Sequence, residues 1–166
     1  VLSLNIQVPE GWIEKRRIAA DLVEQYIRVG IDASASVLAD ATWNENRDTG
    51  NFDGIIDWEA CGSVNEPWNS MNRYTNHFLV PVGERSPGAN NFIRWSGPGN
   101  DRYTELVDQI GSLPLGDPQI VDLVVEAMTI WYEEMPFIPL TQATKLVPFD
   151  TTYWVGWPTA ENNYNH

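Results

Sequence analysis

The sequence predicts an α/β domain, on the border of the α+β class, in which a small mixed sheet is flanked by helices. Two observations lead to this prediction. A strand, an amphipathic helix and a second strand follow one another within residues 2–38, and two further amphipathic helices lie within residues 101–135. A chain of 166 residues is also long enough to form one domain around its own hydrophobic core.

The first three elements form a predicted βαβ unit. Residues 2–8 alternate apolar and polar side chains, the pattern of a half-buried strand, and residues 31–38 alternate in the same way. Between them, residues 12–29 read as an amphipathic helix that Gly30 is placed to end. The apolar stripe of this helix consists of Ile18, Leu22, Tyr26 and Val29. A βαβ unit of this length predicts that its two strands are parallel.

Shorter elements follow, separated by turn residues. The expected order is a short helix from Asp40 or Thr42 to near Gly50, a strand at 52–58, a loop at 59–69, a short helix at 70–78, mostly irregular chain at 79–100, a helix at 101–113, a helix from Pro118 to about Met135, and strands at 145–149 and 153–155. We assign the apolar stripes of the two late helices to the core: Tyr103, Leu106, Val107 and Ile110, then Ile120, Val124, Ala127, Met128 and Trp131.

Composition excludes several function classes. The chain has 10 Lys and Arg against 23 Asp and Glu, a net charge of −13, which argues against nucleic acid or an anionic membrane as partner. One cysteine and two histidines leave no disulfide framework and no Cys-based zinc site, so we predict no metal and no cofactor. The chain starts at Val1 without a signal peptide, and both ends look cut, so we expect a piece excised from a longer protein.

The order of segments resembles the C-terminal lobe of a family 5 extracellular solute-binding protein, the receptor of ABC importers for oligopeptides, dipeptides, nickel or oligosaccharides. The resemblance covers nearly the whole chain. Five segments carry it: residues 29–32 (VGID), residues 42–43 (TW) followed by 48–53 (DTGNFD), residues 91–95 (NFIRW), residues 134–140 (EMPFIPL) and residues 155–162 (VGWPTAEN). None of these motifs is specific alone, but five in the right order form a strong joint signal.

The resemblance implies a function in transport without chemistry. Residues 1–166 would be a single lobe of a two-lobe receptor, with the N-terminal lobe of the same chain missing. Such a receptor captures an oligopeptide or oligosaccharide between its lobes, closes, and delivers the ligand to the ABC permease subunits. It works outside the cytoplasm, in the periplasm or at the outer face of the membrane, lipid-anchored or soluble. Eight tryptophans favour a sugar slightly over a peptide.

The candidate ligand site lies beyond the carboxyl end of the third strand, where ligands of α/β sheets bind. Trp58 and Trp68 can stack on a sugar face or pack on a peptide side chain. Glu59, Asn65 and Asn69 can form hydrogen bonds with hydroxyls or an amine. Arg94 and Trp95 are a second candidate pair, although Arg94 can equally bridge a loop to a helix. We assign the other tryptophans on helical stripes to the core: Trp12, Trp43 and Trp131.

Two alternatives come from other function classes. Residues 65–67 (NEP) follow a strand, as in many retaining glycosidases, where the glutamate, here Glu66, is the general acid/base. Such TIM barrels need about 250 residues, and no second carboxylate can be placed near Glu66 from sequence. Cys61 with His77 as a nucleophile and base is weaker still. The other alternative is a protein-interaction module whose exposed aromatic residues contact a partner.

Overall fold

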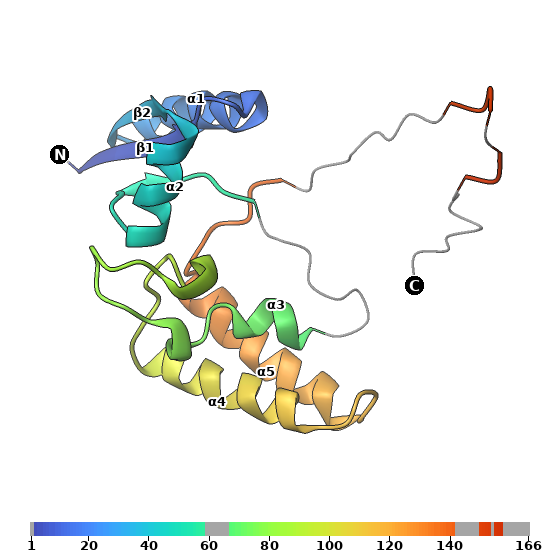
Figure 1. Cartoon of the computed structure of the whole chain (residues 1–166). Coiled ribbons are helices and arrows are strands. Elements are labelled where there is room, and N and C mark those ends of the chain that lie inside the picture. Colours follow the sequence, from blue (N-terminus) through green and yellow to red (C-terminus); the bar gives the residue numbers. More distant parts are fainter. Residues whose placement is uncertain (1, 59–66, 142–149, 154, 158–166) are drawn as a thin grey trace.

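The computed structural model describes residues 2–58, 67–141, 150–153 and 155–157, and confirms the α/β class (Figure 1). Its sheet has three strands in the order β2-β1-β3, and both described pairs are parallel. The strands are β1 (Ser3–Pro9), β2 (Asp32–Leu38) and β3 (Gly54–Ile55). The observed third strand is therefore much shorter than the apolar run at 52–58 suggested.

The helix α1 (Ile13–Arg28) joins β1 to β2, which confirms the predicted βαβ unit. It covers the apolar face of the sheet, where Ile6 and Val8 of β1 and Ala19 of α1 are buried. Leu22 and Tyr26 pack against this cluster as predicted. Val29 does not: it follows the last turn and is 74% exposed, because the chain turns away toward β2 there.

The opposite face of the sheet is polar. The Nδ2 group of Asn5 donates to the hydroxyls of Ser34 and Ser36, each at 2.9 Å. Gln7, two residues further along β1, accepts a hydrogen bond from Asn46 of α2 (Asp40–Thr49) at 2.9 Å. Alternation along β1 therefore sends apolar side chains to α1 and polar side chains to α2, as the pleat requires.

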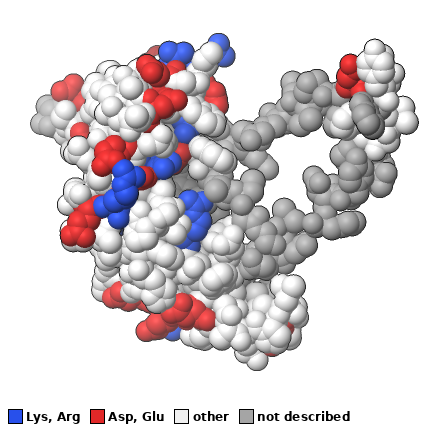
Figure 2. Space-filling view, viewed as in Figure 1, with Lys and Arg blue, Asp and Glu red and all other residues white. Residues whose placement is uncertain are grey.

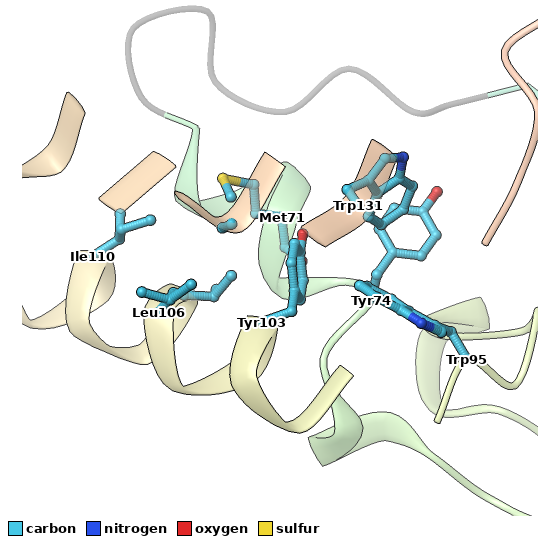
Figure 3. Packing of buried hydrophobic residues seen from close by; sticks show 9 residues of the cluster. Met71, Tyr74, Trp95, Tyr103, Leu106, Ile110 and Trp131 are labelled. Atoms are coloured by element: carbon cyan, nitrogen blue, oxygen red, sulfur yellow. The ribbon is translucent and has the colours of Figure 1, made fainter. Parts of the chain in front are cut away.

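The helical layer lies on the far side of α2 from the sheet (Figure 1). It consists of α3 (Trp68–Asn72), α4 (Pro98–Ser112) and α5 (Gln119–Glu134), with 3-10 turns at Asn76–Phe78 and Pro87–Ala89. Figure 3 shows side chains from α3, α4 and α5 meeting in one core. The predicted stripes are confirmed, since the buried members include Tyr103, Leu106, Val107, Ile110, Ala127 and Trp131.

The chain between α3 and α4 is hydrogen-bonded to the C-terminal end of α2. It thereby links the helical layer to the part of the molecule that contains the sheet. The amides of Gly83 and Ser86 donate to the carbonyls of Thr49 and Asp48, each at 2.8 Å. This segment is largely irregular, as expected, although α4 starts at Pro98 rather than Asp101. The expected strand at 145–149 lies outside the described residues, and Tyr153 of the last expected strand is in a turn. No helix in the described ranges is long and apolar enough to cross a lipid bilayer.

Candidate functional site

Two tryptophans stand together where the parallel strands end. Trp12 follows β1 as the N-terminal cap of α1, and Trp58 follows β3. Because β1 and β3 are parallel neighbours, their carboxyl ends meet at one edge of the sheet. The two indoles stack there with centroids 6.1 Å apart and planes inclined by 23°. We call Trp12 and Trp58 the tryptophan pair.

The tryptophan pair is accessible to solvent. Trp12 is 40% exposed and Trp58 is 54% exposed. The prediction that Trp12 belongs to the core is therefore wrong. Helical spacing placed Trp12 on an apolar stripe, but this residue has an extended backbone and precedes the first helical turn, after the turn residues that follow β1. The sequence signal that was missed is its position just after a strand, the same position that identified Trp58.

A buried ion pair next to the tryptophan pair connects the first turn of α1 to the chain that follows β3. The ammonium group of Lys15 donates to Asp57 Oδ1 at 3.0 Å, and the side chains are only 5% and 13% exposed. The same carboxylate oxygen accepts the backbone N–H of Trp58 at 2.8 Å. Lys15 Nζ also lies 4.8 Å from the ring centroid of Trp12, within cation–π range. Lys15 thus contacts Trp12 from α1, while Asp57 binds the backbone of Trp58 after β3.

Trp43 lies in the interior next to Lys15. It is 4% exposed, which confirms its assignment to the core. Two cations lie over its ring: Lys15 Nζ at 4.4 Å and the Arg47 guanidinium carbon at 5.2 Å. Arg47 in turn pairs with Asp48 at 2.9 Å and with Asp57 at 3.4 Å. Both cations are thereby neutralised within the protein.

Of the other predicted loop residues, the structure describes Trp68 and Asn69, and it places them in the helical layer. Trp68 begins α3, is 36% exposed and packs over Gly111 of α4, in a surface pocket that Leu115 also lines. Asn69 is exposed beside it. The structure therefore places Trp58 with the sheet and Trp68 with the helical layer. The remaining calls on this loop lie outside the described residues: Glu59, Cys61, Asn65 and Glu66.

Arg94 and Trp95 are engaged by the protein itself. Arg94, with a φ of 58°, donates to the carbonyl oxygens of Asp48 at 3.0 Å and Glu84 at 2.7 Å. Burial lowers the pKa of its guanidinium, and the charge of Asp48 partly opposes this shift. Trp95 is 8% exposed and its Nε1 donates to Glu134 at 2.6 Å. This arrangement favours a bridging role for Arg94 and a core role for Trp95.

Side chains suited to metal binding are not clustered in the described part of the chain. No set of three or more His, Cys, Asp or Glu side chains could hold an ion there. His77 instead faces Asp108 at 2.9 Å, with both side chains about half exposed. On the face drawn in Figure 2, acidic and basic side chains are mixed over the upper and middle parts, while the lower part carries mainly acidic groups.

Comparison with known proteins yields structural likenesses only. No protein-family model and no curated protein sequence matches the chain. A periplasmic oligopeptide-binding protein of an oligopeptide ABC transporter from Thermotoga maritima, with bound mannohexaose, is 22% identical with a TM-score of 0.78, covering 99% of this chain and 29% of that one. DppA from Helicobacter pylori, with the peptide STSA, is 13% identical with a TM-score of 0.68, covering 84% and 25%.

A third neighbour is the periplasmic binding protein MelB from Agrobacterium fabrum in complex with stachyose, 14% identical with a TM-score of 0.63, covering 81% of this chain and 20% of that one.

The chain has the fold of a segment of the family 5 solute-binding proteins. It spans less than a third of the length of each of these three neighbours. The fold that the sequence resemblance implied is therefore confirmed.

Proposed function

We propose that this chain is one lobe of an extracytoplasmic solute receptor that serves an ABC importer. The observation that carries the proposal is the exposed tryptophan pair at the carboxyl edge of a parallel sheet, within a fold shared with periplasmic binding proteins. Ligand captured between this lobe and a second lobe is enclosed when the receptor closes, and the closed form delivers it to the permease. The receptor performs no chemistry on the ligand.

The ligand is an oligopeptide or an oligosaccharide. Among the structural neighbours, the proteins from Thermotoga maritima and Agrobacterium fabrum hold mannohexaose and stachyose, and the one from Helicobacter pylori holds a peptide. Trp58 is the contact we propose first, with Glu59, Asn65, Trp68 and Asn69 as further contacts on the chain that follows it. Arg94 and Trp95 have less support as contacts, because their polar groups already bind the protein.

A thermal-shift screen of the intact receptor tests this proposal. Di- to pentapeptides are compared with cello-, xylo- and manno-oligosaccharides. A ligand at 100 times its dissociation constant adds about 2.7 kcal/mol to the free energy of unfolding, which raises the melting temperature measurably. We expect one of the two classes to give such a rise. A receptor that no peptide and no oligosaccharide stabilises contradicts the proposal, and cleavage of a tested oligosaccharide contradicts its non-catalytic part.

A further inference from the structure

We infer that Trp12, together with Trp58, forms a stacking platform for a neutral sugar ring and thereby selects an oligosaccharide as ligand. This inference rests on the proposed receptor function and adds to it a substrate class and a specificity-determining residue, Trp12. The residue was assigned to the core from the sequence, so the tertiary structure alone brings it to the site.

The geometry of the pair suits a ring-shaped ligand. Trp12 and Trp58 stack on each other with planes inclined by 23°, so each indole turns one side toward its partner and keeps part of its remaining surface open to solvent. Both keep between a third and two thirds of their surface exposed. A pyranose ring carries C–H groups on its faces and hydroxyls around its rim. Its faces therefore pack on an indole, while the hydroxyls remain free to bind polar groups or water.

The charges around the pair favour a neutral ligand. Lys15 is paired with Asp57, and Arg47 is paired with Asp48 and Asp57. These are the cations that lie over the rings of Trp12 and Trp43 in the described part of the chain. A peptide carboxylate that reached the pair would have to break one of these ion pairs or be desolvated without a partner, and either event is costly. A neutral sugar carries no such penalty.

The pair is held in place before a ligand arrives. Asp57 Oδ1 accepts hydrogen bonds from both Lys15 Nζ and the backbone N–H of Trp58, which fixes the chain at the end of β3. The Lys15 ammonium group lies over the Trp12 ring, which fixes the indole at the end of β1. Binding to such a prepared surface avoids the entropy cost of ordering the aromatic side chains. Lys15 is therefore a positioning residue for the platform.

Titration calorimetry on the intact receptor, with mannohexaose, cellohexaose and a pentapeptide as probes, tests the inference. Trp12→Leu keeps an apolar side chain but removes the flat ring, and Trp12→Phe keeps a flat ring. We expect Trp12→Leu and Trp58→Leu each to weaken binding of the hexasaccharide about tenfold or more, and Trp12→Phe to restore part of the loss. Tyr132→Leu, at an aromatic residue 61% exposed on α5, is the matched control and should leave the affinity unchanged.

Each other outcome has a separate meaning. Hexasaccharide binding that Trp12→Leu leaves unchanged, in a variant with the normal circular dichroism spectrum, overturns the platform while the receptor function stands. Binding of the pentapeptide alone also overturns the inference and leaves the receptor function intact. Failure of every probe to bind overturns both. If Trp12→Leu does not fold, Trp12→Phe and Trp58→Leu decide, since a ring-dependent affinity in these two variants is required.

Discussion

Lys15 and Asp57 form an ion pair of 3.0 Å between the first turn of α1 and the residue that follows β3 by two positions. Both side chains are almost completely removed from solvent. The pair therefore couples a helix to a strand end that is distant in sequence. It also determines what surrounds the tryptophan pair, because Asp57 binds the backbone of Trp58 and Lys15 contacts the ring of Trp12.

Replacing Lys15 by Met should lower the free energy of unfolding by about 3 kcal/mol, since it leaves the buried Asp57 without its nearest cation. Arg28→Met on the same helix is the matched control. Arg28 pairs with Glu24, but both side chains are about two thirds exposed, so the loss should stay below about 1 kcal/mol. Urea denaturation of the intact receptor, followed by tryptophan fluorescence, measures both values. Equal losses in the two variants would contradict the structural role of Lys15.

The aromatic core of the helical layer predicts a large difference between two adjacent residues. Trp131 is buried and its ring lies 4.8–5.7 Å from those of Tyr74, Trp95, Tyr103 and Phe137. Trp131→Ala should cost about 3–5 kcal/mol through the cavity it creates. Tyr132→Ala removes an exposed side chain and should change stability by less than about 0.5 kcal/mol. The same denaturation experiment measures the loss of free energy of unfolding in both variants. Similar losses would contradict the burial of Trp131 in this core.

The close approach of Gly99 and Glu134 predicts that substitutions at these two positions have non-additive effects on stability. A methyl group on Gly99 would overlap the carboxylate of Glu134, which accepts the indole N–H of Trp95 at 2.6 Å. Gly99→Ala should displace the carboxylate and cost about 1–3 kcal/mol, the value of a hydrogen bond to a charged group. In a Glu134→Ala background the same change should cost nearly nothing, because the overlap and the hydrogen bond are both absent. Additive costs in this double-mutant cycle would refute the coupling.

Substitution of Arg94 should change the stability of the receptor but not its affinity for ligand. The guanidinium of Arg94 donates to the carbonyls of Asp48 and Glu84, so Arg94→Met removes two charge-assisted hydrogen bonds and should destabilise the receptor by about 2 kcal/mol. Gly50→Ala should weaken the same contact, since Gly50 has a φ of 72° and an added methyl group would press on Arg94. If Arg94 bridges elements as the geometry indicates, ligand affinity changes less than twofold in the folded Arg94→Met variant. A larger loss, measured by calorimetry, would restore Arg94 as a ligand contact.

Local patterns in the sequence were sufficient to predict most helices and strands and many of the buried residues. Tyr103, Leu106 and Ile110 recur at helical spacing, and a helix must bury such a stripe, so their burial follows from residues close together in the chain. The same holds for the βαβ unit, since a helix of that length between two alternating strands is the usual connection of a parallel pair. The likeness to solute-binding proteins was also predictable, because its segments keep their order along the chain.

The site needed the tertiary structure. Trp12 was misplaced because helical periodicity does not tell whether an apolar residue lies inside the first turn or just before it. The order β2-β1-β3 then brings Trp58 to its side, a pairing that no local pattern encodes. Arg94 was ambiguous for the same reason: an arginine next to a tryptophan suits a ligand or a carbonyl equally, and its partners on α2 are distant in sequence. Periodicity determines which face of an element is buried, whereas contacts between distant segments determine which exposed groups meet.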